Sequence, residues 1–148
     1  MSTINPLMAS HHKHCDQLFA DAEHAASEND WNACKLLLER FTAAMDAHFR
    51  AEEELLFPAF EQITDTRGGP TEVMRGEHAQ MRELFASLTA AVAAASDADF
   101  FGASDTLAVF MEQHNRKEEG ILYPMCDDRI TDREQLAERL HRLVGASA

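Results

Sequence analysis

Apolar residues recur at spacings of three and four along most of the chain, which is the pattern of helices that bury one face. No segment alternates apolar and polar residues in the manner of a strand. Six glycines and four prolines leave few interruptions in 148 residues. The pattern therefore predicts an all-α protein.

Start and stop signals place the first two helices. Asn5 is predicted to cap a first helix from about Pro6 to Ser27, with proline at the first helical position. Asp30 is predicted to cap a second helix, which runs from Trp31 towards Ile63. The segment DTRGGP, residues 65–70, is the clearest loop.

The second half repeats this arrangement. A third helix is predicted from Pro70 or Thr71 to near Ser96, and a fourth from the caps at 97–99 to about residue 126. Thr131 and Glu134 form a capping box for a short fifth helix, over about 131–144. Four long helices with short connections predict an up-down-up-down four-helix bundle, in which residues 1–148 form one domain with a short C-terminal fifth helix.

Each predicted long helix carries one core-facing stripe. The stripes are Met8, His12, Cys15, Phe19 and Ala22; Phe41, Met45, His48, Glu52 and Leu55; Met74, His78, Met81, Phe85, Leu88 and Val92; and Leu107, Met111, His114, Glu118 and Ile121. Four histidines and two glutamates are thus predicted to face the middle of an otherwise apolar bundle.

Two stretches of the sequence are nearly the same. HFRAEEELLFPAF, residues 48–60, and HNRKEEGILYPMC, residues 114–126, match at a constant offset, since 114 minus 48 is 66. The same shift places MASHHKHCDQLF, residues 8–19, on MRGEHAQMRELF, residues 74–85, so that His12 corresponds to His78. We interpret the chain as an internal duplication of a helical hairpin, over about 6–65 and 70–128.

The inward-facing polar residues predict a metal site. Buried carboxylates are costly unless they are paired, hydrogen-bonded or bound to metal, and the stripes carry no lysine or arginine. A histidine and a glutamate four residues apart lie on one face of a helix, one turn apart, and can reach the same centre. The predicted ligands are His12, His48, Glu52, His78, His114 and Glu118.

The donor set favours two ions over one. Two six-coordinate ions offer about twelve positions, of which four histidines and two bridging glutamates would fill about eight and a shared oxygen bridge about two. About one position per ion would stay open. Mixed nitrogen and oxygen donors in a helical bundle suit iron or manganese, whereas zinc fits less well because it prefers closed tetrahedral sites.

This pattern of His, His-x-x-x-Glu, His, His-x-x-x-Glu resembles the hemerythrin-like (HHE cation-binding) domain, over the chain up to about Asp128. The resemblance implies a four-helix bundle with a non-haem di-iron centre. The likeness to oxygen-carrying hemerythrins is less close, because Arg82 stands where those proteins have a further histidine and Glu119 where they have an aspartate. The symmetric ligand set looks more like the bacterial domains linked to nitric-oxide stress and iron-centre repair.

Several neighbours of the predicted ligands have open roles. His11 and His14 flank the first-helix ligand and either could add a ligand, although register favours His12. Pro58 and Pro124 are expected to kink or end their helices.

Three further glutamates lie near the predicted ligands in sequence. Glu53 and Glu119 are expected to be surface residues or to support the ligands from outside. Glu77 is either a plain surface acid or a proton donor beside the site.

Composition limits the partners and the compartment. A formal net charge of −13 argues against nucleic acid and anionic membranes, which both select basic proteins. No apolar run approaches the ~20 residues that span a bilayer, and the first residues lack a signal-peptide pattern. Cys15, Cys34 and Cys126 form an odd set without close pairs, so we expect reduced thiols and a cytoplasmic location.

Two main function classes follow. The first is a di-iron protein that binds or senses a diatomic ligand, O2 or NO, or handles iron under oxidative or nitrosative stress. The alternative is an enzyme that turns over O2, peroxide or NO, or repairs iron centres; a third class is a helical module with a structural metal. The sequence shows no dinucleotide fingerprint and no CxxC motif, so turnover would need electrons from a redox partner protein. This favours binding.

Overall fold

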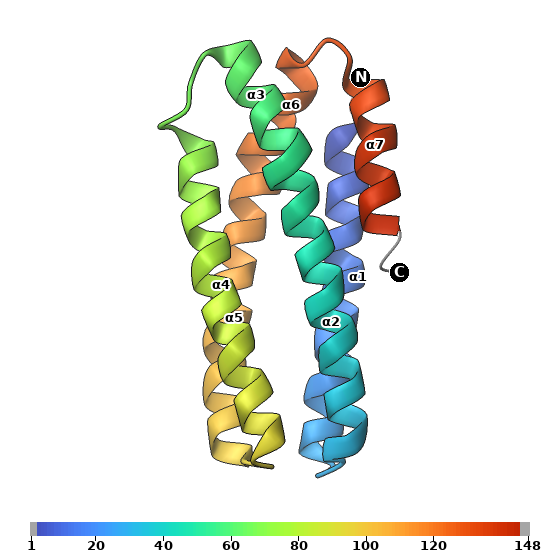
Figure 1. The fold of residues 1–148 in the computed structure, drawn as a ribbon, viewed down its shortest axis with the longest axis vertical. Helices are drawn as coiled ribbons and strands as arrows, with labels where there is room; N and C mark the ends of the chain where they lie inside the picture. Colours follow the sequence, from blue (N-terminus) through green and yellow to red (C-terminus); the bar gives the residue numbers. More distant parts are fainter. Residues whose placement is uncertain (1–2, 146–148) are drawn as a thin grey trace.

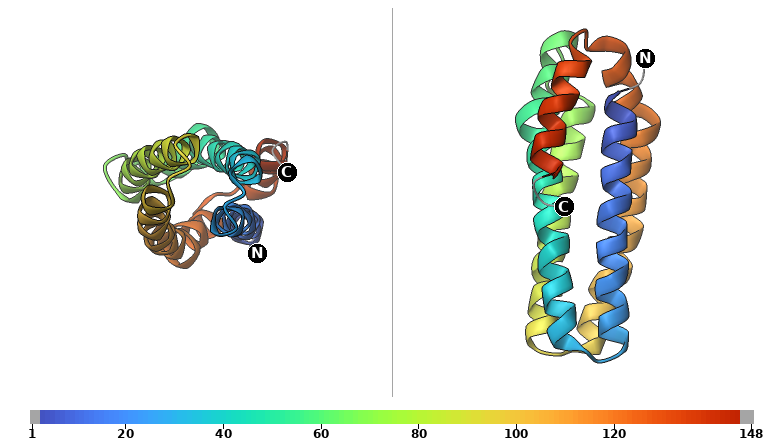
Figure 2. Two further views of the ribbon diagram at one scale, coloured as in Figure 1. Left: turned by 90° about the horizontal axis from the view of Figure 1, so that it is seen from below. Right: turned by 90° about the vertical axis from the view of Figure 1, so that its right-hand side faces the viewer.

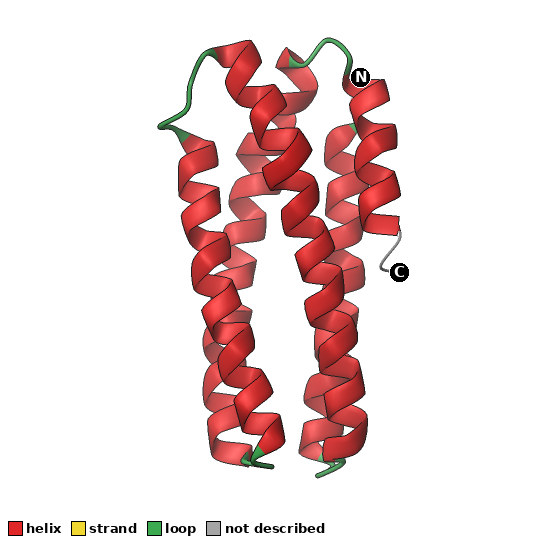
Figure 3. Ribbon diagram, viewed as in Figure 1, coloured by secondary structure: helices red, strands yellow, loops and turns green. Residues whose placement is uncertain are grey.

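The computed structural model describes residues 3–145, and all of the regular structure in that range is helical (Figure 3). In chain order the elements are α1 (Ile4–Ser27), α2 (Trp31–Ala51), the π-helical turn η1 (Glu52–Leu56), α3 (Phe57–Thr64), α4 (Pro70–Ala93), α5 (Asp97–Lys117), the π-helical turn η2 (Glu118–Leu122), α6 (Tyr123–Arg129) and α7 (Arg133–Gly145).

These elements form four antiparallel helical columns, namely α1, α2–η1–α3, α4 and α5–η2–α6 (Figure 1). Seen from below, the columns form a ring, and α7 lies outside the ring against α1 and α2 (Figure 2). The predicted all-α bundle with a short C-terminal helix is confirmed. In the part of the chain that the structure describes, no helix is long and apolar enough to cross a membrane.

Local sequence signals explain the starts of α2, α4 and α5. The Asp30 side chain accepts a hydrogen bond from the backbone N–H of Ala33 at 3.1 Å, and the Ser96 hydroxyl accepts one from Asp99 at 3.3 Å. Pro70 begins α4 after Gly69, as expected. The helix α4 ends at Ala93, earlier than predicted.

The first and last helices begin at other residues than predicted. The helix α1 starts at Ile4 instead of Pro6, and α7 starts at Arg133, two residues after Thr131. The first turn of α1 is capped from the other end of the chain. The Asp127 carboxylate accepts hydrogen bonds from the backbone N–H groups of residues 3, 4 and 5, at 2.9, 2.8 and 3.0 Å. This cap ties α1 to α6.

The two π-turns change the register of the helices that contain them. The N–H of Phe57 donates to the carbonyl oxygen of Glu52, and the N–H of Tyr123 to that of Glu118, five residues back in each case. The extra residue per turn rotates the following side chains, so Phe57 and Tyr123, five residues after the glutamates, are buried. The prediction that the core-facing stripes continue after Glu52 and Glu118 through Leu55 and Ile121 is wrong.

The residues predicted to continue those stripes are not in the core, although Leu55 packs against the edge of an apolar cluster. Leu55 is only half-buried and Ile121 is 58% exposed. Pro58 and Pro124 do not end their helices, which continue to Thr64 and Arg129. Proline lacks the N–H for an α-helical bond and its ring crowds the carbonyl four residues back. A π-turn directly before each proline accommodates both effects.

The core is divided by a polar layer. One apolar cluster lies on the side of the α1–α2 connection, around Phe41, Phe85 and Leu107; the other lies towards α3, α6 and α7, around Phe57, Phe60 and Leu140. Between the two clusters lie the inward-facing histidines and glutamates. The three cysteines are buried with free thiols.

Candidate metal centre

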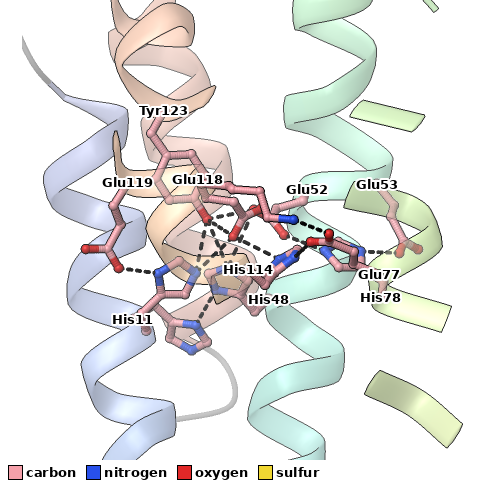
Figure 4. Close-up of polar contacts among 12 residues, drawn as sticks. His11, His48, Glu52, Glu53, Glu77, His78, His114, Glu118, Glu119 and Tyr123 are labelled. Atoms are coloured by element: carbon pink, nitrogen blue, oxygen red, sulfur yellow. Dashed lines mark hydrogen bonds and ion pairs between the residues drawn. The ribbon is translucent and has the colours of Figure 1, made fainter. Parts of the chain in front are cut away.

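The structure brings together the six residues that the sequence predicts as ligands (Figure 4). All six are buried. Every column contributes: His12 comes from α1, His48 and Glu52 from α2–η1, His78 from α4, and His114 and Glu118 from α5–η2.

The six residues fall into two groups that share one carboxylate. Glu52, His78, His114 and Glu118 offer donor atoms that all lie within 4.8 Å of one another. His12, His48 and Glu118 form a second such group. The arrangement is therefore two adjoining sets of donors, with Glu118 in both.

The inner contacts join histidine Nε2 atoms to glutamate oxygens. The Nε2 atom of His78 lies 3.0 Å from Glu52 Oε1, and that of His114 lies 3.2 Å from Glu118 Oε1. Within residues 3–145, these two Nε2 atoms and Glu52 Oε1 have no hydrogen-bond partner despite their burial. Buried polar atoms left in this state are costly. Lone pairs that face a common point in this way fit a bound cation.

Three of the four histidines have a carboxylate on their other ring nitrogen. The Nδ1 atom of His12 lies 2.7 Å from Glu119 Oε2, and that of His78 lies 2.6 Å from Glu53 Oε2. Likewise, the Nδ1 atom of His114 lies 2.7 Å from an oxygen of Glu77.

When each of these histidines carries its proton on Nδ1 and donates it to the outer carboxylate, its Nε2 lone pair points to the centre of the layer. A histidine needs this tautomer to bind a metal through Nε2. The sequence led us to expect Glu53 and Glu119 at the surface or in support of the ligands, and Glu77 as a surface acid or a proton donor. In the structure all three are hydrogen-bond partners of the histidines. Arg82 also donates to Glu53 at 3.2 Å, and Lys117 pairs with Glu77.

His48 is the exception, because its outer partner is another histidine. The Nδ1 atoms of His48 and His11 lie 2.9 Å apart, and the two rings are stacked. Shifted by 66 residues, the position of Glu77 is occupied by His11. The His14 ring packs against His11, with centroids 5.7 Å apart. His11 therefore takes the place beside His48 that the carboxylates take beside the other three histidines.

His48 also differs from the other three histidines in the direction in which its pKa is shifted. Burial alone would lower the pKa of His114, but the negative charge of Glu118 raises it to about 9. The pKa values of His12 and His78 are likewise raised, because the glutamates outweigh the effect of burial. Burial prevails at His48, so its pKa is lowered, and burial together with His48 lowers the pKa of His11 to about 3.

Tyr123 is the residue of the site that sequence reasoning missed. Its side chain is fully buried, and its hydroxyl donates to Glu52 Oε2 at 2.6 Å or to Glu118 Oε1 at 2.9 Å. The same oxygen lies 3.2 Å from Nε2 of His48 and 3.3 Å from Nε2 of His12. One signal was available: at the offset of 66 residues the corresponding residue is Phe57, so the hydroxyl breaks the repeat.

Comparison with known proteins gives one match. The model of the hemerythrin family, described as the hemerythrin HHE cation binding domain, matches residues 3–126. No curated protein and no solved structure gives a significant match to the chain.

Proposed function

We propose, because this chain belongs to the hemerythrin HHE cation-binding family, that its buried layer of histidines and glutamates is a di-iron centre. The family identifies the chain as a metal-ion-binding protein. The observation that carries the proposal of two ions is the pair of donor groups that meet at Glu118. A single ion held by Glu52, His78, His114 and Glu118 would leave the second group, in which His12 and His48 also present buried Nε2 atoms, without an ion.

In this proposal the histidines are terminal ligands and the glutamates are bridges. His78 and His114 hold one ion, and His12 and His48 hold the other. Glu52 presents one oxygen to each side: its Oε1 lies 3.0 Å from Nε2 of His78, and its Oε2 lies 3.6 Å from Nε2 of His48. Glu118 belongs to both groups. Two bridging carboxylates also balance part of the charge of the ions, in a layer that both apolar clusters shield from water.

Iron fits this donor set better than zinc. Four imidazoles and two carboxylates offer more donors than one closed tetrahedral site uses, whereas iron and manganese accept mixed nitrogen and oxygen ligands at higher coordination numbers. Iron would supply the redox chemistry and the open positions that a diatomic ligand needs. We therefore propose that the protein binds or senses O2 or NO in the cytoplasm, in oxidative or nitrosative stress or in iron handling. We also propose that the two halves of the site descend from one duplicated hairpin.

Metal analysis and rapid mixing test this function. Protein purified from cells should contain two irons per chain, and the reduced protein mixed with O2 or NO should form a stable adduct in a stopped-flow spectrum. One tightly held zinc without a second ion would refute the di-iron centre. Repeated turnover with a supplied reductant would instead identify an enzyme, and no reaction would leave the metal a structural role.

Variants test the assignment of ligands. Glu118→Ala removes the residue that both groups share, so it should weaken the binding of both ions. His78→Ala removes a terminal ligand and should weaken mainly one. Equal loss of a single ion in both variants would contradict the bridging role of Glu118.

A further inference from the structure

We propose that the Tyr123 hydroxyl is an additional ligand of the ion held by His12 and His48, which leaves the open position for a diatomic ligand on the ion held by His78 and His114. This inference rests on the proposed di-iron function and adds to it which ion binds the small molecule. It rests on the surroundings of the hydroxyl oxygen and on the place of that oxygen beside the smaller donor group.

The first feature is the spacing of donor atoms around the hydroxyl oxygen (Figure 4). Four atoms surround it: Glu52 Oε2 at 2.6 Å, Glu118 Oε1 at 2.9 Å, His48 Nε2 at 3.2 Å and His12 Nε2 at 3.3 Å. In an octahedral shell with metal–ligand bonds of about 2.1 Å, each ligand atom has four neighbours at about 3.0 Å. The surroundings of the hydroxyl match one corner of such a shell.

The second feature is the unequal size of the two donor groups. The group with His78 and His114 contains four residues, whereas the group with His12 and His48 contains three. The Tyr123 hydroxyl lies against the smaller group, close to both of its histidines. Glu52, which is proposed above as a bridge, brings each side to four residues, and Tyr123 adds a fifth donor only on the side of His12 and His48.

The third feature is a shortage of protons. A phenol has one proton to donate, but the Tyr123 oxygen lies within hydrogen-bond distance of two different carboxylates. With the proton of His12 on Nδ1, where it is donated to Glu119, the one phenol proton can satisfy only one of these two carboxylates. A cation at the centre of these atoms satisfies all of them together, with the phenol proton released as the ion binds.

The asymmetry has a consequence for ligand binding. The six predicted ligands and an oxygen bridge leave about one open position on each of two six-coordinate ions. Tyr123 fills the position on the His12/His48 ion. A diatomic ligand therefore binds to the other ion, on the side of His78 and His114.

The experiment uses the fact that Tyr123 is the only tyrosine of the chain. Full-length protein is loaded with iron(III), and its visible absorption and resonance Raman spectra are recorded. A tyrosinate-to-iron(III) charge-transfer band with phenolate vibrations is expected, and no other residue can produce it. Tyr123→Phe should lose both signals while elemental analysis still finds two irons. A phenylalanine is expected to fit, since Phe57 holds the corresponding position in the first half.

NO titration of the reduced protein gives the second measurement. We expect one NO per pair of ions in the wild type and two in Tyr123→Phe, in which the second position is open. Two bound irons without tyrosinate signals would overturn this inference and leave the di-iron function intact. A protein that takes up no iron would refute the proposed function and this inference with it.

Discussion

The carboxylates that accept a hydrogen bond from Nδ1 of the histidines should affect the affinity of the site for metal. Glu53 offers the clearest test, because its Oε2 lies 2.6 Å from Nδ1 of His78 and its side chain is 27% exposed. A net hydrogen bond between neutral groups contributes about 1 kcal/mol, and a charge-assisted one about twice that. Removing the contact should therefore lower metal affinity without emptying the site.

The size of the effect should depend on what replaces the carboxylate. Glu53→Gln keeps an acceptor oxygen and loses the charge, so about 1 kcal/mol is lost, which is roughly a fivefold weaker affinity. Glu53→Ala loses the whole contact, so about 2 kcal/mol is lost, or roughly thirtyfold. The thirtyfold value for Glu53→Ala lies within the 10- to 100-fold range of about 1.4–2.7 kcal/mol typical for outer partners of metal ligands, and the smaller value for Glu53→Gln lies below it.

The assay is competition between the iron(II)-loaded protein and a chelator, with elemental analysis as a measure of stoichiometry. Glu54→Gln is the matched control, because Glu54 is 53% exposed, neighbours Glu53 in sequence and pairs with Arg50 on the surface. It should leave affinity unchanged. An unchanged affinity in Glu53→Ala would refute the supporting role, and loss of a whole ion would show that Glu53 is itself a ligand.

Three further predictions follow from the fold and the site. Leu56→Ala should lower the free energy of unfolding by about 2–5 kcal/mol because Leu56 is fully buried, whereas Leu55→Ala should cost less because Leu55 is half-buried; equal effects in urea titrations would contradict the deeper burial of Leu56. Asp127→Ala should cost about 2 kcal/mol, since a buried carboxylate caps three N–H groups of α1; an unchanged melting temperature would argue against that cap. In metal-free protein the pKa of His114 is raised from 6.5 to about 9, so its contribution to stability is complete below pH 6.5 and is lost as the pH rises through 9. Chemical denaturation across that interval should show the decline, and a flat profile would contradict it.

The sequence predicted the bundle and the convergence of the candidate ligands because both depend on periodicity. His12, His48, His78 and His114 lie on stripes that any regular helix would turn inwards, and an i, i+4 spacing keeps each glutamate on the same face. The inward placement of these residues could therefore be predicted without knowing how the helices pack against one another.

Tyr123 escaped prediction because its position depends on an irregular turn. On an α-helix it would lie about 140° around the axis from Glu118, at about 100° per residue over five residues. The π-turn returns it to the inner face, and the sequence of that turn, EEGIL, carries no periodic sign of the extra residue.

Two other contacts could not be predicted from the sequence, each for its own reason. His11 lies one residue round the helix from His12, and its burial depends on the side on which α2 packs against α1. Asp127 and the start of α1 are more than 120 residues apart in sequence, so no local signal joins them.

The division of the core into two apolar clusters affects how the molecule opens. Each cluster is held together by its own apolar contacts, and the polar layer lies between them. Cooperative unfolding requires that the loss of one part destabilises the rest. In the metal-free protein that coupling passes through the helix backbones and the hydrogen bonds of the layer, so backbone amides near the two ends of the bundle should exchange with solvent at different rates. Ions bound to all four columns would join the two ends into one foldon, and amide exchange would then slow at both ends together.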